Sequence, residues 1–259
     1  DLANPDWAWE FLRRSEAYGT EARRFGCLTT WQFLAQETFA YRACADARHK
    51  RRRGASYPFA PPEQQAPLAP VVWSDSAFHR ELIAETDRDA ALSDLDFNVS
   101  SLPLNVHLHI DALERQHLII KSANAHVVLL ISGPLVSAGP VHIRIILEGL
   151  RHLDRDIASL SAFAQLVHGV SRRTVHGRPG PVEAIKLRDA LIALDGERAG
   201  ASRREIATVI YGAERVAEEW NEPSGRLKAV IKRDALRGRR IVAGGYLKLV
   251  AGGTNRARA

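Results

Sequence analysis

The sequence has no methionine, only two cysteines and no long apolar run. Cys27 and Cys44 lack the CxxC spacing of metal or redox sites, so we expect two reduced thiols. Apolar runs such as Val127–Ile131 fall far short of the ~20 residues that a membrane span needs. The acidic start of the chain does not resemble a secretory signal, and the missing Met places the expected natural start upstream of Asp1. These absences predict a cytoplasmic protein that does not enter a membrane.

Common enzyme motifs are also missing. The chain has no GxGxxG or GxxxxGK[ST] phosphate loop and no GxSxG nucleophile elbow. Neither cysteine has an obvious base nearby, and the acidic pair Asp94 and Asp96 lies in an expected loop, where solvation explains it. We therefore expect no enzyme, no catalytic residue and no cofactor.

Histidines gather in the middle of the chain. His107 and His109 form an H-x-H pattern on one face of an expected strand, and His126 and His142 lie on other strands. Such residues could begin a three-histidine metal site. An exposed strand face with neutral histidines explains them equally directly, because no Asp or Glu is placed convincingly beside them. We favour that second interpretation and expect no metal.

The positive charge is concentrated in one part of the chain. The net charge is +6, from 36 Lys and Arg against 30 Asp and Glu. Residues 178–259 contain 17 Lys and Arg against ten acids, whereas the other 177 residues contain 19 against 20. A localised basic region is typical of nucleic-acid binding, although a solvated surface can look the same.

Periodicity and composition divide the chain into four parts. Aromatic residues at helical spacing, including Trp7, Phe11, Trp31 and Phe39, predict an N-terminal helical segment over 1–44. The basic and proline-rich stretch 45–70 is typical of a linker. β-branched segments then predict a small, mostly antiparallel central sheet, followed by a helix over Leu150–Leu166. We expect an α+β fold divided into 1–44, 45–70, 71–177 and 178–259, the last helical and similar to a helix-turn-helix domain.

A short helix is expected near residue 203. Ser202 and Glu205 form an S-x-x-E capping box, and Gly212 suits a left-handed helix end. Ile206 and Ile210, with Val209, share one face, as in the supporting helix of a helix-turn-helix unit. Its Arg203 and Arg204 would at most touch backbone phosphates.

The next long helix, about 224–240, carries the stronger signal. It has seven Lys and Arg against one acid, Asp234, beside an apolar stripe of Leu227, Val230 and Ile231. Such a helix can lie along a DNA groove, neutralising phosphates and pairing one or two arginines with guanine. The alternative is a solubilising face that meets an acidic partner protein. The acidic segment 213–222 would repel phosphate, and Gly244 and Gly245 predict a hairpin that could serve as a wing.

Both ends of the chain resemble a known family. WAWEFLRRSEAY (Trp7–Tyr18) resembles the N-terminal signature of a proteobacterial transcriptional-regulator-like family, and GASRREIATVIYGAERVAEEW with LKAVIKRDALRGRRIVAGGYLKL resembles its C-terminal domain. That domain is regarded as of helix-turn-helix type and occurs in activators encoded on integrative and conjugative elements. The resemblance implies transcriptional regulation, often activation of genes for element excision or transfer. It also implies contacts with proteins, including antiactivators, but it transfers no DNA-contacting residue.

We therefore predict a DNA-binding transcriptional regulator, an activator of mobile-element genes, with promoter DNA as its partner. The alternative is a protein-interaction module with a degenerate helix-turn-helix fold that binds RNA polymerase or an antiactivator. From charge and helix geometry alone, the predicted DNA-contacting residues are Arg203, Arg204, Arg226, Lys228, Lys232, Arg233, Arg237, Arg239 and Arg240.

Overall fold

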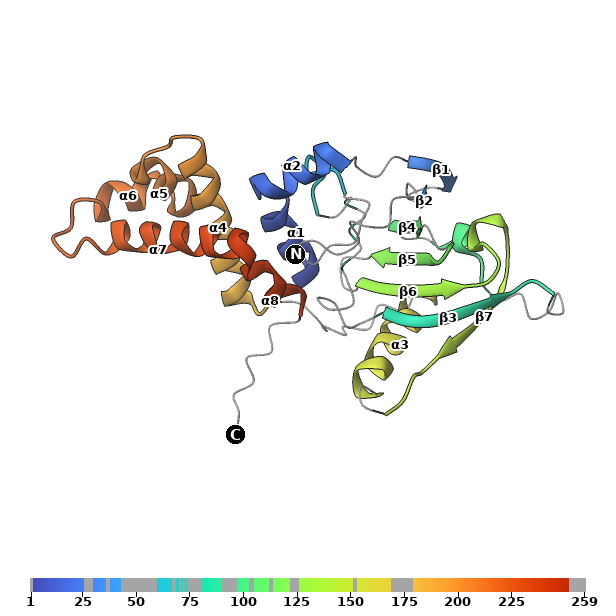
Figure 1. Ribbon diagram of the computed structural model, residues 1–259. Coiled ribbons are helices and arrows are strands. Elements are labelled where there is room, and N and C mark those ends of the chain that lie inside the picture. Colours follow the sequence, from blue (N-terminus) through green and yellow to red (C-terminus); the bar gives the residue numbers. More distant parts are fainter. Residues whose placement is uncertain are drawn as a thin grey trace.

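The structure is a computed structural model in which a mixed sheet, a pair of N-terminal helices and a C-terminal helical unit follow one another in space (Figure 1). It describes residues 2–25, 30–35, 38–42, 60–66, 69, 71, 73, 81–89, 97–102, 105–111, 114–121, 126–150, 153–168 and 179–251. Among these residues, no helix combines the length and the apolar character needed to cross a bilayer.

Helices lie at both ends of the described chain, and strands occupy its middle. The helices are α1 (Asn4–Leu12), α2 (Glu16–Phe25), α3 (Leu153–Val167), α4 (Pro181–Arg198), α5 (Arg203–Tyr211), α6 (Ala213–Glu219), α7 (Arg226–Arg240) and α8 (Tyr246–Val250). Single turns of tighter or wider helix occur at η3 (Val99–Ser101), η4 (Val136–Ala138) and η5 (Ile241–Gly245). The strands are β1 (Thr30–Ala35), β2 (Thr38–Arg42), β3 (Glu81–Asp87), β4 (Asn105–Ile110), β5 (Gln116–Lys121), β6 (His126–Ser132) and β7 (His142–Ile146).

The strands form one sheet in the order β1-β2-β4-β5-β6-β3-β7. Its centre is the meander β4-β5-β6, whose pairs are antiparallel with Leu108 opposite Leu118 and Leu118 opposite Leu129. β2 joins β4, and β3 joins β6, in parallel, while β7 closes one side antiparallel to β3. The expected α+β fold with a mostly antiparallel central sheet is therefore confirmed.

One face of the sheet packs on α3. Alternate residues of the central strands, such as Leu108, Leu118 and Leu129, are fully buried in a cluster that also contains Phe163 and Leu166 of α3. This alternation is the period-two pattern of strands, and it places the remaining residues on the opposite face. That opposite face meets the N-terminal helices through Ile119 and Val128.

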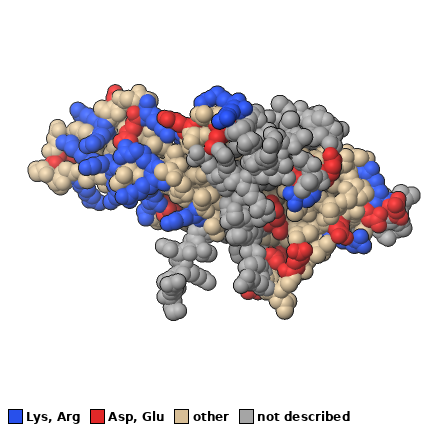
Figure 2. Space-filling view, viewed as in Figure 1, with Lys and Arg blue, Asp and Glu red and all other residues tan. Residues whose placement is uncertain are grey.

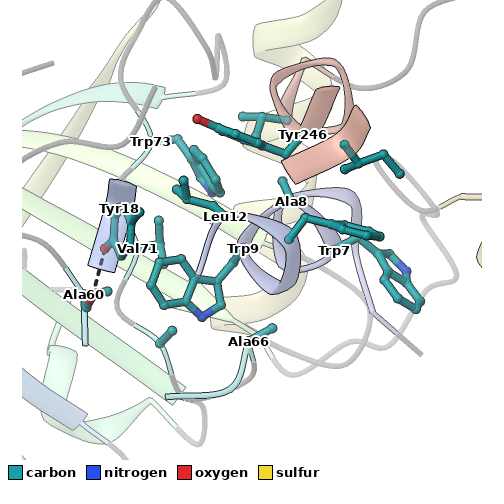
Figure 3. Packing of buried hydrophobic residues seen from close by; sticks show 14 of the residues in the cluster. Trp7, Ala8, Trp9, Leu12, Tyr18, Ala60, Ala66, Val71, Trp73 and Tyr246 are labelled. Atoms are coloured by element: carbon teal, nitrogen blue, oxygen red, sulfur yellow. Dashed lines mark hydrogen bonds between the residues drawn. The ribbon is translucent and has the colours of Figure 1, made fainter. Parts of the chain in front are cut away.

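The N-terminal helices build a second core from aromatic residues (Figure 3). Trp9 and Tyr18 pack edge to face with ring centroids 5.4 Å apart, and Trp73 lies 6.3 Å from Tyr246 of α8. Such aromatic pairs add stabilisation beyond the area that they bury. The cluster also contains Leu187 and Leu194 of α4 and Val250 of α8, so α1 and α2 join the sheet to the C-terminal helices.

Three expectations about the first half of the chain are wrong. Residues 30–35 and 38–42, read as helical from their aromatic spacing, are the paired strands β1 and β2. The β-branched segment FNVSS (97–101), one of those predicted as strands, forms a single bridge at Phe97 and the helical turn η3, and β3 lies where no strand was predicted. The described part of the expected linker is packed: Trp9 Nε1 donates to the Gln64 carbonyl at 2.9 Å and the Tyr18 hydroxyl to the Ala60 carbonyl at 2.8 Å. The basic cluster 49–53 lies outside the described residues.

One buried ion pair involves α1, and a partly exposed ion pair involves the turn that follows it. The Lys121 ammonium is buried, donates to the carbonyls of Ala66 and Ala69, and lies 3.6 Å from the Asp6 carboxylate. On the other side, Arg14 makes two 2.7 Å hydrogen bonds to the carboxylate of Asp195 on α4. Burial lowers the pKa of Lys121 and raises that of Asp6, so each charged form depends on its partner.

Candidate nucleic-acid interface

The helix α5 begins as its sequence predicts. Ser202 Oγ accepts from the Glu205 amide at 3.3 Å, and the Glu205 carboxylate accepts from the Ser202 amide at 2.7 Å. This capping box satisfies free amides at the helix start. Arg203 and Arg204 are exposed in the first turn. Gly212 has the expected positive φ of 89°, but its ψ of 155° is extended, so it is not a left-handed helical cap.

The apolar side of α5 is narrower than expected. Ile206 is 2% exposed and Ile210 is half-buried, whereas Val209 is 70% exposed and does not join the core. The acidic helix α6 buries Val216, and Trp220, the residue after it, packs against the same cluster. Its Arg215 pairs with Glu219 at 2.7 Å.

α7 has one buried side and one basic side. The buried side contains Leu227, Ile231, Asp234, Ala235 and Gly238. The predicted apolar stripe is confirmed at Leu227 and Ile231, which are at most 4% exposed, while Val230 is half-buried. All seven basic residues lie off the buried side, and all of them except Arg237 are exposed.

The basic residues of α7 are not equivalent. Arg237 is ion-paired with Glu183 and Arg239 with Glu197, so both bind acids at opposite ends of α4. Lys228 lies over the ring of Trp220, 5.4 Å from its centroid. The other four make no ion pair with an acid in the described part of the chain; they are Arg226, Lys232, Arg233 and Arg240. These side chains are the most available to an external anion.

A glycine sets the position of α7 on α4. The two helices pack closely at Gly238, where an added methyl group would lie 2.6 Å from the Ala190 carbonyl oxygen and 3.0 Å from Cβ of Leu194. A side chain at this position would therefore push the helices apart. The glycine lets α4 support the buried side of α7, and the basic side stays open.

The predicted hairpin after α7 does not form. Instead, the chain passes through a single wide turn, η5, and continues into α8, with a kink at Gly244. Gly244 has φ 133° and ψ −10°, a conformation that other residues rarely adopt. α8 then packs Tyr246 and Val250 into the core beside α1. The Gly244-Gly245 pair is thus a helix kink, and a wing at this place is excluded.

Acidic residues lie beneath the basic surface. Asp234 of α7 is 6% exposed, and burial raises the pKa of its carboxyl group. Asp189 of α4 raises that pKa further, while Arg233 and Arg237 oppose the shift. Burial, with the charges of Asp234 and Asp189, also raises the pKa of the Tyr211 hydroxyl. The carboxylate of Asp234 therefore contributes little to the exposed surface of α7.

Lys and Arg dominate the visible surface of the C-terminal helical unit (Figure 2). In the same view as Figure 1, blue side chains lie over α5 and follow α7, while the visible described surface of the sheet has a mixture of both signs. The sequence-derived charge imbalance thus corresponds to a continuous part of the surface. Such a surface attracts a polyanion over distances comparable to the Debye length.

The central histidines are buried, not exposed as expected. His107 and His109 are each 2% exposed, and burial lowers the pKa of both imidazoles to about 3. Both are therefore neutral, as expected. His109 and His117 are cross-strand neighbours with ring centroids 5.6 Å apart. No group of three or more metal-binding side chains occurs within the described ranges, and the side chain of His126 lies outside them.

Sequence reasoning missed the contacts that orient the helical unit. Arg14 and Asp195 are 181 residues apart, and the pairs made by Arg237 and Arg239 join residues 54 and 42 positions apart. No spacing rule connects such residues. It also missed Leu236, which is 39% exposed on the basic side of α7. Helical periodicity could have found that residue, because position 236 lies opposite the buried stripe.

Comparison with known proteins adds an independent result. Residues 149–251 match the family model described as "T6SS, Transcription factor, DNA binding domain", which is not an enzyme family. The matched part is less than half of the 259 residues and includes α3 as well as α4 to α8. No curated protein matches the chain. The chain thus contains a region similar to a transcription-factor DNA-binding domain, and this supports a DNA-binding transcription regulator.

Proposed function

We propose that the chain regulates transcription by binding promoter DNA through the basic side of α7. The observation that carries the proposal is the set of four cationic side chains without a described acidic partner: Arg226, Lys232, Arg233 and Arg240. They lie on one helix inside the matched region. A rigid helix that presents several free cations to solvent suits the major groove, whose width admits a helix.

In this proposal, the basic residues on the two flanks of α7 contact DNA phosphates. Arg226 and Lys232 lie on opposite sides of the α7 outer surface, where they can reach the two DNA strands that border a groove. Arg203 and Arg204 supply further charge from the first turn of α5. Arg237 and Arg239 were also predicted to contact DNA. In this proposal they instead hold α7 on α4 through their ion pairs.

Salt-dependent binding tests the proposal. The full chain is titrated against promoter-derived and random duplexes at several salt concentrations, with fluorescence anisotropy as readout. Arg226→Ala and Lys232→Ala should each weaken binding and reduce the slope of log K against log salt by about 0.9, one phosphate contact. Lys248→Ala, which removes the same charge from the exposed surface of α8, is the matched control. A wild-type slope in the α7 variants contradicts the proposal.

The regulated genes follow from the resemblance of the two chain ends. It supports activation of genes on an integrative and conjugative element, whereas the matched family description names a T6SS regulator. We propose the former. Chromatin immunoprecipitation followed by a promoter-reporter assay tests this: we expect enrichment at element promoters and reporter expression that rises with the protein.

A protein-binding role is the second candidate. Val182 and Ile185 at the start of α4 are 65% and 50% exposed, and Val209 of α5 is 70% exposed. Large apolar side chains at such exposure suit contact with RNA polymerase or an antiactivator. If DNA binding is absent or insensitive to salt, and Val209→Asp abolishes capture of purified polymerase, this candidate replaces the first.

A further inference from the structure

Four residues define the outermost line of α7: Ala229, Arg233, Leu236 and Arg240. Their spacing of four, three and four residues keeps them within about 60° of one another around the helix. They lie opposite the buried Leu227 and Gly238, and all four are exposed. We call these four residues the outer line of α7.

The outer line alternates between apolar and cationic side chains. Leu236 exposes 39% of its surface although Arg233 and Arg240 lie one turn away on either side. A single exposed leucine needs no explanation. An alanine and a leucine alternating with two arginines, each without an ion pair to an acid in the described chain, form a more specific pattern.

The base edges of the major groove match these two kinds of side chain. Guanine presents two acceptors, N7 and O6, that an arginine can bind with both of its terminal donors, and thymine presents a methyl group that suits an aliphatic side chain. Residues 229–240 span about 16 Å along the helix axis, which corresponds to roughly five base pairs.

We infer that the outer line of α7 reads a short site in which thymine and guanine alternate. Ala229 and Leu236 contact thymine methyl groups, and Arg233 and Arg240 bind guanine. This inference rests on the proposed function and adds the class of DNA sequence that the protein binds. The flanking Arg226 and Lys232 contact phosphates and carry no sequence preference.

The ion pairs of α7 support the assignment of base contacts to the outer line and phosphate contacts to the flanks. Arg237 and Arg239 are committed to Glu183 and Glu197, and Lys228 lies over Trp220. These contacts fix the rotation of α7 about its axis, so that the outer line, and not a flank, points away from the protein. A fixed rotation is needed for base contacts, because a bidentate arginine tolerates little change in direction.

Selection from a randomised duplex library with the full chain is the first test. We expect enriched sequences with guanine and thymine in alternation over about five base pairs. Arg233→Lys, at an exposed position, should reduce preference for one guanine by about 5- to 150-fold, the range for a bidentate pair.

Replacing thymine by deoxyuridine in the selected site is the second test and needs no protein variant. Deoxyuridine lacks only the methyl group, so wild-type affinity should fall about fourfold per contacted thymine. Leu236→Ser, which puts a polar group at this position, should lose this discrimination at one position and keep the wild-type salt slope. Its melting temperature verifies that the variant is folded.

The outcomes separate the inference from the proposed function. If selected sites show no guanine or thymine preference, or if uracil weakens wild type and Leu236→Ser equally, the outer line does not read bases. The proposed function then still stands, provided that Arg226→Ala reduces the salt slope. If the chain binds no DNA at any salt concentration, both are wrong, and Leu236 is assigned to a protein contact.

Discussion

Gly238 offers the sharpest test of how α7 is positioned. In Gly238→Ala, the new methyl group would lie 2.6 Å from the Ala190 carbonyl oxygen, whereas ordinary contacts begin at 3.4 Å. The obstacle is backbone of α4, which cannot turn aside as a long side chain can. α7 must therefore shift by several tenths of an ångström, and the same shift displaces the buried residues on either side of the crossing.

The magnitude follows from two opposing effects. Overpacking of this kind costs about 1–3 kcal/mol, while Gly→Ala inside a helix contributes about 1 kcal/mol of stability. We expect a net loss of up to about 2 kcal/mol in the free energy of unfolding, measured by urea denaturation of the full chain. DNA affinity should fall as well, because the rotation of α7 is disturbed.

Gly19 provides the matched control. It lies inside α2, and a methyl group there would lie 3.4 Å from Nη1 of Arg23, the flexible end of a side chain. Gly19→Ala should therefore stabilise the protein by up to about 1 kcal/mol. The reasoning is refuted if Gly238→Ala is as stable as wild type or if both variants change stability in the same direction.

Three further predictions concern charges in the core. The pKa of His109 is lowered from 6.5 to about 3, so between these values the unfolded chain binds a proton that the folded chain does not. This histidine should therefore cost about 1.4 kcal/mol in the free energy of unfolding for each unit by which the pH falls below 6.5. His109→Phe should show a shallower loss of stability in denaturation experiments at pH 7, 6 and 5. Lys121→Met should cost about 3 kcal/mol by leaving Asp6 buried without its cation, and Lys121→Met with Asp6→Asn should recover most of it in thermal melts; a double variant no better than the single one contradicts the pairing. A double-mutant cycle of Arg14→Ala and Asp195→Ala should give a coupling energy of about 1–2 kcal/mol, and additive effects would show that the bidentate pair contributes nothing.

Local signals in the sequence predicted local structure well. The capping box of Ser202 and Glu205 located the start of α5, and the 3.6-residue period located the buried side of α7. β4 to β7 followed from β-branched segments. In each case the determining contacts lie within a few residues along the chain, so propensity and periodicity suffice.

Tertiary contacts decided the features that the sequence did not predict. Prolines near residues 61–67 suggested a linker, but backbone carbonyls in this stretch accept hydrogen bonds from Trp9 and Lys121, which only the folded chain brings near. The Gly244-Gly245 pair signals a change of direction and cannot reveal that Tyr246 packs beside Trp73. β2 pairs with β4, a strand more than sixty residues away, and β1 in turn pairs with β2.

The same contacts give the N-terminal helices a specific role in placing α7. Glu10 of α1 is buried and accepts hydrogen bonds from Arg13 and Arg14 and from the Ala66 amide. Its carboxylate therefore holds both the segment around Ala66 and Arg14, the arginine that binds α4. These bonds lower the pKa of Glu10 despite its burial. Because Arg14 then fixes Asp195, and α4 fixes α7 at Gly238, displacement of α1 would be transmitted to α7 through packed side chains. Contacts that run from the sheet through α1 and α4 thus help to set the orientation of the basic side of α7.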